Sequence, residues 1–205
     1  LASPIELEFA IEVDDARGVK MFAILQVRPL MDESVDIDIK LDEVDREGAV
    51  CISSKSVGKG VIEGICDVIY VHPDRMNRMR TFDLVPLIEE IDARLREEGR
   101  PYVLIGPGRW GSSDPSLGIP VQWNQIMGAK TIVEAPMADI HVDPSQGTHF
   151  FQNIITFNIG YLTIGPEDFL DWEWLDSRAP ASESGPLRHV RLENSIKVIL
   201  DSRDS

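Results

Sequence analysis

A strict alternation of apolar and polar residues near the start of the chain places the strongest constraint on its fold. Residues 5–13 predict a strand with one buried face, because apolar side chains recur at every second position (Ile5, Leu7, Phe9, Ile11 and Val13). Residues 19–27 predict a second strand, with four apolar side chains on one face (Met21, Ala23, Leu25 and Val27). Turn-forming residues 14–18 separate the two strands, and Pro29 ends the second. Together these features predict a hairpin.

An acidic segment follows the predicted hairpin. Residues 32–47 hold eight acidic and two basic side chains, a composition typical of a solvated connector, with room for a short strand over 35–39. We therefore place a boundary near residue 31, with one part over residues 1–31 and a second over 32–205. Because the chain opens abruptly in a strand, we expect it to start inside another fold and to belong to a larger protein.

The second part predicts a mixed α/β domain with a largely β core. Its clearest helix covers 84–98, and Gly99 follows at the position of a C-terminal cap. Shorter helices are predicted over 121–127 and 148–154. Glycine- and proline-rich stretches predict loops over 106–119 and 177–186, the second of them mobile. Strands are predicted over 49–54, 61–71, 102–105, 130–134, 155–164 and 196–200.

Composition limits the classes of partner. The net charge of −15 argues against a general nucleic-acid binder, which needs a basic surface, although a single nucleotide needs only a few local cations. Cys51 and Cys66 lie in apolar runs and predict buried free thiols in a reducing compartment. The sequence has no apolar run of membrane-spanning length and no leader. We therefore expect a cytoplasmic protein without a membrane partner.

Three polar residues of the predicted hairpin could form a ligand site. Glu8 lies among apolar neighbours, and Gln26 and Arg28 share a face of the second strand. Carboxylate and amide oxygens suit Mg²⁺, while a guanidinium suits phosphate oxygens. The alternative is an exposed amphipathic hairpin with ordinary surface charges.

The residues of this hairpin resemble a known family. Ile5-Glu6-Leu7-Glu8-Phe9-Ala10, followed after a turn by Phe22-Ala23-Ile24-Leu25-Gln26-Val27-Arg28-Pro29, is similar to the end of the ATP-binding domain of phosphoenolpyruvate synthase and pyruvate phosphate dikinase. The resemblance implies the terminal hairpin of an ATP-grasp fold, in which Glu8 and Gln26 hold Mg²⁺-ATP and Arg28 contacts its phosphates. It also implies an upstream ATP-grasp domain of the same polypeptide as partner.

The resemblance covers residues 5–29, and the rest of the chain departs from the family. A Gly-Gly-x-x-Ser-His phosphohistidine motif is missing after residue 29, and the remaining length is too short for the pyruvate-binding barrel. Residues 32–205 resemble the C-terminal region of proteins described as containing a PEP/pyruvate-binding domain. There the stretches Gly-Pro-Gly-Arg-Trp-Gly-Ser-Ser-Asp-Pro and Ser-Gln-Gly-Thr-His-Phe-Phe recur.

The loop after residue 105 satisfies the pattern G-x-G-x-x-G. In a dinucleotide-binding unit this loop opens a helix, and an acid follows where Glu134 stands. Two prolines downstream argue against that helix. A looser anion site is the alternative, in which Arg109 and nearby backbone N–H groups and hydroxyls hold a phosphate or carboxylate, with Trp110 stacking or packing. Its residues are Gly106, Gly108, Arg109, Gly111, Ser112 and Ser113. An ordered loop without a ligand is equally compatible with the pattern.

His149 is the candidate catalytic residue. Near a predicted helix start it could act as a general base or accept a phosphoryl group, whereas beside two phenylalanines it could be a hydrogen-bonded core residue. The aromatic and acidic stretch 168–175 predicts an amphipathic edge or a partner surface.

Three functions remain open from the sequence. The first is a C-terminal fragment of an ATP-dependent phosphotransferase, which alone has no turnover and binds neither Mg²⁺ nor ATP tightly. The second is a module that binds a small anionic molecule at residues 106–114. The third is a structural domain that forms a homodimer without a ligand.

Overall fold

The computed structural model describes residues 5–14, 18–29, 48–137 and 149–201. The chain divides into two compact units, Leu1–Asp36 and Ile37–Ser205. The predicted turn at 15–17 and the acidic connector at 32–47 lie outside the described residues, as does the boundary between the units.

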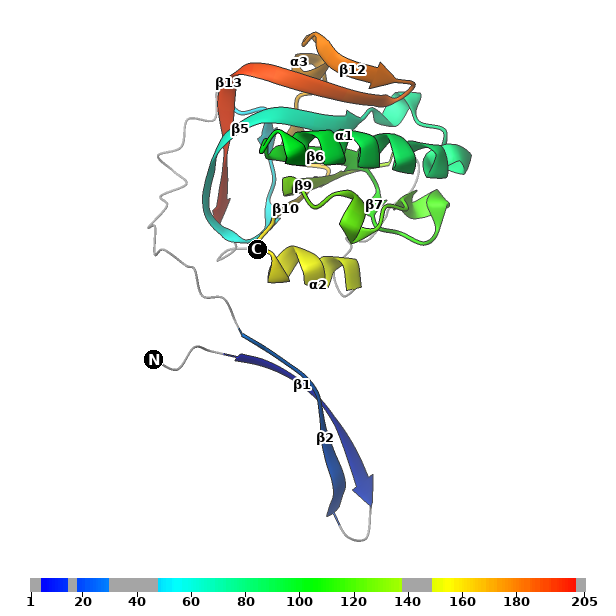
Figure 1. Ribbon diagram of the computed structural model, residues 1–205, viewed down its shortest axis with the longest axis vertical. Coiled ribbons are helices and arrows are strands. Elements are labelled where there is room, and N and C mark those ends of the chain that lie inside the picture. The colour runs from blue at the N-terminus through cyan, green and yellow to red at the C-terminus, as the bar shows by residue number, and fades with distance from the viewer. Residues whose placement is uncertain (1–4, 15–17, 30–47, 138–148, 202–205) are drawn as a thin grey trace. The chain divides into compact units, whose positions relative to one another are not determined.

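The first unit is the predicted hairpin (Figure 1). Strand β1 (Ile5–Asp14) pairs antiparallel with β2 (Gly18–Pro29), which confirms both strands. The register shifts between Glu8 and Phe9, so that Leu25 has no partner. The expectation that residues 21, 23, 25 and 27 share a face is therefore wrong, because a bulge of one residue reverses the alternation.

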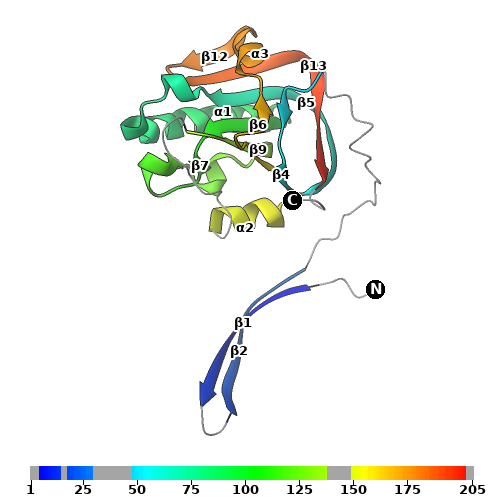
Figure 2. The same cartoon turned by 180° about the vertical axis from the view of Figure 1, so that it is seen from behind.

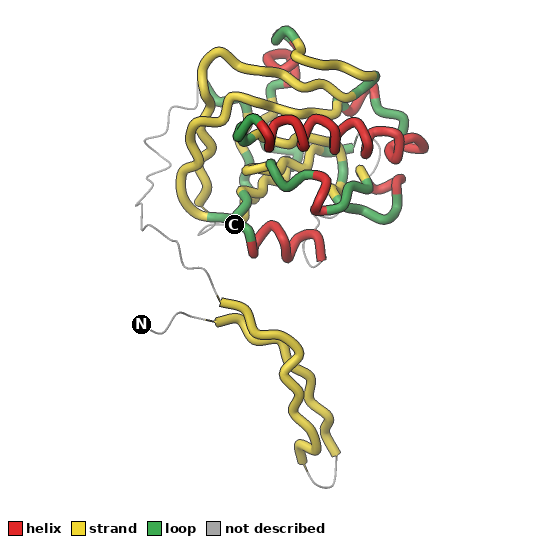
Figure 3. Tube along the Cα trace, viewed as in Figure 1, coloured by secondary structure: helices red, strands yellow, loops and turns green. Residues whose placement is uncertain are grey.

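The second unit is a mixed α/β fold around a seven-stranded sheet (Figures 1 and 3). Four central strands are parallel and follow each other in chain order, while antiparallel strands complete both sides. The order across the sheet is β12 (Pro180–Ser184), β13 (Leu187–Asp201), β5 (Lys59–Val71), β6 (Tyr102–Pro107), β9 (Ala129–Ala135), β10 (Gly160–Thr163) and β4 (Lys55–Val57).

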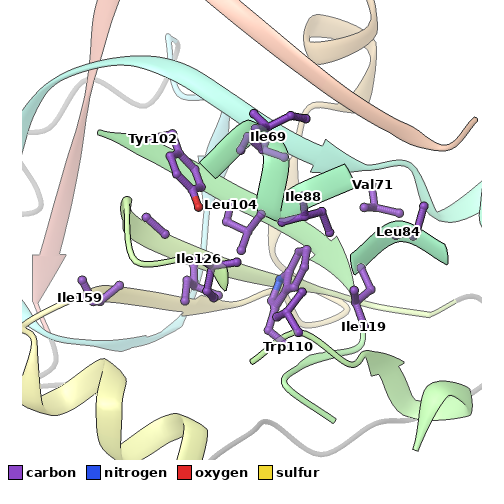
Figure 4. Close-up of a cluster of buried hydrophobic side chains, with 14 of the residues drawn as sticks. Ile69, Val71, Leu84, Ile88, Tyr102, Leu104, Trp110, Ile119, Ile126 and Ile159 are labelled. Carbon is purple, nitrogen blue, oxygen red and sulfur yellow. The ribbon is translucent and has the colours of Figure 1, made fainter. Parts of the chain in front are cut away.

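The helices cover both faces of this sheet. Helix α1 (Val85–Glu97) and helix α2 (His149–Thr156) contribute to one buried cluster, which includes Trp110 and Ile119 (Figure 4). Helix α3 (Trp172–Asp176) contributes Leu175 to a second cluster on the opposite face (Figure 2). On that face β3 (Cys51–Ile52) pairs with β11 (Phe169–Leu170).

Helix α1 forms where the sequence predicts it. Three apolar side chains one turn apart, Ile88, Ile91 and Leu95, are buried against the sheet. The helix ends in a Schellman motif, in which the amide of Gly99 donates to the carbonyl of Arg96 and the amide of Arg100 to that of Leu95. Gly99 has a φ of +64°, which glycine adopts without steric cost.

Several other predicted elements differ from the structure. Residues 177–186 form the edge strand β12 and its turn instead of a mobile loop, because residues 180–184 pair with the start of β13. The helix expected over 121–127 is a 3-10 turn, Trp123–Gln125. Helix α2 continues through Thr156, so β10 starts at Gly160 and not at residue 155. The predicted strand over 49–54 is shorter, since β3 covers only Cys51–Ile52, and β4 is a separate strand after it.

The predicted loop over 106–119 contains regular structure. Strand β7 (Arg109–Trp110) pairs in parallel with β8 (Gly118–Ile119), and a 3-10 turn, Pro115–Leu117, lies between them. Within the residues that the structure describes, no helix is long and apolar enough to cross a membrane.

Candidate functional site

The glycine loop leaves the carboxyl end of β6, at the edge of the sheet where parallel α/β folds bind their ligands. Gly106 is the first of its glycines. A Cβ there would lie 2.5 Å from the Trp110 ring, so glycine is needed for the close packing of this indole. Trp110 is 1% exposed, and its Nε1 donates to the carbonyl of Val133 at 3.3 Å. Trp110 therefore packs in the core (Figure 4) and does not stack on a ligand.

The backbone of the loop is held by hydrogen bonds within the fold. The amide of Gly108 donates to the carbonyl of Ala135, and that of Gly111 to the carbonyl of Ile119, both at 2.9 Å. The hydroxyl of Ser112 donates to the carbonyl of Asp114 at 2.9 Å. The two amides expected to hold an anion thus already have acceptors. Of the remaining candidates, Ser113 is exposed and Arg109 is half-buried.

Glu134 fixes the loop to the sheet. This carboxylate is 4% exposed at the end of β9 and accepts the amide N–H of Trp110 at 3.0 Å. Its other oxygen accepts the hydroxyl proton of the buried Tyr161 on β10. A carboxylate held in this way cannot bind a ribose, and strand β7 follows the glycines where a dinucleotide site requires a helix. Both findings agree with the argument against a dinucleotide site.

The glycine loop and the histidine segment meet in the fold. A Cβ on Gly111 would lie 2.5 Å from the ring of Phe150, so the loop packs directly against the first turn of α2. Phe150 is buried. The backbone of His149 begins this helix, but its side chain and residues 145–148 lie outside the described residues. The structure thus brings together two motifs that are far apart in the sequence.

The candidate ligand residues of the hairpin occupy neighbouring positions of the two paired strands. Glu8 pairs with Gln26, and Glu6 pairs with Arg28. The side chains of Glu8, Gln26 and Arg28 lie outside the described residues. Among the residues that are described, no group of three or more His, Cys, Asp and Glu side chains could hold a metal ion.

The chain matches no protein-family model, no curated protein and no solved structure.

The two cysteines are free thiols, as the sequence predicts, but they are less buried than expected. Cys51 and Cys66 are free thiols, and both are half-buried. Burial, with a smaller effect of Asp168, raises the pKa of Cys51 to about 12, which makes this thiol a poor nucleophile. Cys51 packs on the α3 side of the sheet, whereas α2, which the backbone of His149 begins, packs on the other side.

Sequence reasoning missed a polar cluster around Asp67. This aspartate is fully buried on β5 and lies 2.7 Å from His189 Nε2, 2.6 Å from Arg100 Nη2 and 3.1 Å from Arg191 Nε. Arg94 Nη2 lies 3.3 Å from the other ring nitrogen, Nδ1 of His189. The signal present in the sequence was the acidic residue Asp67 inside the otherwise apolar run Ile65–Val68. A buried aspartate needs partners, but its partners come from segments that no local pattern connects to it.

Proposed function

We propose that residues 5–29 form one wall of a Mg²⁺-ATP site in an ATP-dependent phosphotransferase of the phosphoenolpyruvate synthase type. The register of the hairpin carries this proposal, because it places Glu8 opposite Gln26 and Glu6 opposite Arg28. Opposed positions of an antiparallel pair share a face and lie about 5 Å apart. A carboxylate, an amide and a guanidinium thus occupy neighbouring positions.

This set of groups fits the expected ligands. Mg²⁺ is commonly held by one or two protein groups together with phosphate oxygens, and the residue types at positions 8 and 26 supply such oxygens. Arg28 supplies a guanidinium for phosphate. When bound, the metal would neutralise charge on the phosphates. The role of the hairpin residues is to bind and orient the nucleotide.

Exposed apolar side chains support the assignment of the hairpin to a larger domain. Phe9, Phe22, Ile24 and Leu25 are each between 49% and 61% exposed. An isolated two-stranded hairpin is marginally stable in water, and contiguous apolar surface usually marks a contact region. In the proposal, the rest of an ATP-grasp domain on the same polypeptide covers these residues.

The test is calorimetric titration of Mg²⁺-ATP into the polypeptide that carries an ATP-binding domain before these residues. Glu8→Gln and Arg28→Ala should each weaken binding at least tenfold, or about 1.4 kcal/mol. Glu12→Gln removes a charge further along β1 and should leave the affinity unchanged. The 205-residue chain alone should not hydrolyse ATP. Hydrolysis by that chain at an enzyme-like rate, or unaltered affinity in both variants, would contradict the proposal.

A small-molecule site beside the glycine loop is the second candidate function. The packing of Gly111 on Phe150 favours it, because it places the backbone of His149 next to the loop that carries Arg109. Titration of the 205-residue chain with ATP, phosphoenolpyruvate and pyruvate should give a response to one of them, lost in Arg109→Ala. A lack of response to all three would remove this candidate.

A further inference from the structure

Five polar side chains converge at the carboxyl end of β5. Tyr70 and His72 lie at the end of this strand, Arg75 follows in a 3-10 turn, Arg188 comes from β13, and Asp176 ends α3. All four donors surround the carboxylate of Asp176. Its Oδ1 accepts from Tyr70 Oη at 2.8 Å and from Arg188 Nη1 at 3.0 Å. Its Oδ2 lies 3.0 Å from Arg75 Nη2 and 3.6 Å from His72 Nε2.

The cluster has a buried floor and an accessible side. The side chains of Arg188 and His72 are 9% and 12% exposed, whereas those of Asp176 and Arg75 are 27% and 44% exposed. Trp172 packs on His72, with ring centroids 5.1 Å apart. An anion from solvent can therefore approach the donors at the position of the carboxylate.

The charges of the cluster are balanced while Asp176 occupies it. Arg75 and Arg188 bring two positive charges, and Asp176 brings one negative charge. Glu183 supplies the second negative charge from the edge strand, 3.4 Å from both guanidinium groups, although Arg188 Nε is not aligned with it for a hydrogen bond. When Asp176 is displaced and Glu183 stays, two positive charges face one negative charge, and the positive surplus attracts a phosphate anion.

We infer that Tyr70, His72, Arg75 and Arg188 form a binding site for a phosphate group, which Asp176 occupies as a tethered substitute. Paired guanidinium groups with a hydroxyl are a typical phosphate environment. The cluster lies beyond the carboxyl end of β5, the edge at which parallel strands of α/β folds present their ligand sites.

Asp176 occupies the site because it belongs to the same chain as the four donors. An intramolecular ligand on a short segment competes at an effective concentration of about a millimolar or more. Asp176 also stays ionised near neutral pH, because its contacts with Tyr70, Arg188 and Arg75 lower its pKa more than burial raises it. Phosphate must therefore displace Asp176 together with α3, and removing the carboxylate should raise the affinity for phosphate.

The experiment is titration of inorganic phosphate into the 205-residue chain, followed by calorimetry and by tryptophan fluorescence. Asp176→Ala should bind phosphate at least tenfold more tightly than the wild type. The double variant Asp176→Ala/Arg75→Ala should lose this gain. Glu173→Ala removes an exposed charge from the same helix and should bind like the wild type.

Two results would overturn the inference. One is a folded Asp176→Ala variant that binds phosphate no better than the wild type, and the other is an equal gain in Glu173→Ala. If Asp176→Ala does not fold, hydrogen exchange of the wild-type chain tests the inference instead. Amides 172–176 should exchange faster in phosphate than in chloride of equal ionic strength, and equal exchange would show that the cluster is purely structural.

Discussion

Buried carboxylates connect the segments of the second unit. Asp67, Asp92 and Glu134 are each at most 4% exposed, and each accepts hydrogen bonds from segments far away in the sequence. An ionised carboxylate without partners would cost several kcal/mol in this environment. These three side chains are therefore stable only when their donors surround them. This requirement fixes the positions of α1, the glycine loop and β13.

Stability should decrease as the pH falls from about 7 to 5. Burial lowers the pKa of His189, and Arg94 and Arg191 lower it further, against the raising effect of Asp67. Below the ordinary histidine pKa of about 6.5, His189 therefore binds more protons in the unfolded chain than in the folded one, so the free energy of unfolding decreases as the pH decreases. Urea denaturation between pH 7 and 5 should show this slope of the free energy of unfolding against pH, and His189→Gln should make the slope smaller. An equal slope in the variant would contradict the assignment.

Gly111→Ala should destabilise the fold by about 3 kcal/mol. The added Cβ would lie 2.5 Å from the ring of Phe150, at a φ of +77°. Left-handed backbone costs a non-glycine residue about 1 kcal/mol, and overpacking adds about 2 kcal/mol. Gly99→Ala is the matched control, because its φ is +64° and nothing lies within 4 Å of its Cβ. Urea denaturation of Gly99→Ala should show a loss of about 1 kcal/mol in the free energy of unfolding. Equal losses in the two variants would contradict the contact between Gly111 and Phe150.

At the scale of elements, Asp92 fixes α1 to the sheet. It accepts the hydroxyl proton of Tyr102 at 2.8 Å and the amide of Gly128 at 2.7 Å, and it pairs with Arg96. Asp92→Ala should cost about 3 kcal/mol, since it leaves buried donors without partners. Glu89→Ala removes an exposed hydrogen bond to Gln125 from the same helix and should cost about 0.5 kcal/mol or less. Chemical denaturation of both variants tests this difference.

The sequence predicted elements whose signal is local. Helix α1 has its apolar face and its terminal glycine within one segment, and β6 and β9 are short apolar runs. Strand β12 was mistaken for a loop because its Pro-Ala-Ser-Glu-Ser composition favours turns, while its conformation depends on pairing with β13. The bulge at Leu25 was missed for a similar reason, since a register shift belongs to two strands and not to one.

The candidate site could be predicted only in part. The glycine loop and the start of α2 were both identified as unusual from their residues, but their contact through Gly111 and Phe150 follows from the parallel order of the strands. Hydrogen bonds of the loop amides also depend on that order, because their acceptors belong to β8 and to the end of β9. The Asp176 cluster joins three segments and had no local signal.

At the scale of the whole molecule, the second unit should fold without the hairpin. Both of its hydrophobic clusters consist of residues beyond position 49. A chain of residues 37–205 should therefore unfold with the same thermal midpoint as the 205-residue chain, within about 2 °C, which corresponds to at most about 1 kcal/mol for a domain of this size. Differential scanning calorimetry measures this, and a markedly lower midpoint would show that the hairpin contributes to the stability of the unit.

The hairpin should make the 205-residue chain associate with itself. Its exposed apolar residues, with Phe9 and Phe22 stacked 5.1 Å apart, offer a contiguous contact surface. Light scattering at increasing concentration should detect larger species for the 205-residue chain than for residues 37–205. Phe22→Lys/Ile24→Lys should reduce association without altering the second unit. Equal association of all three proteins would place the contact elsewhere.

The pairing of β5 with β13 has a consequence for how the protein folds during synthesis. The longest ladder of the sheet joins residues 59–71 to residues 187–201, so it cannot form until residues 187–201 have left the ribosome. Contacts between such distant segments make folding slow, because the intervening loop must be closed first. Until then one edge of β5 has no partner strand in the nascent chain, and an unpaired strand edge can pair with other chains.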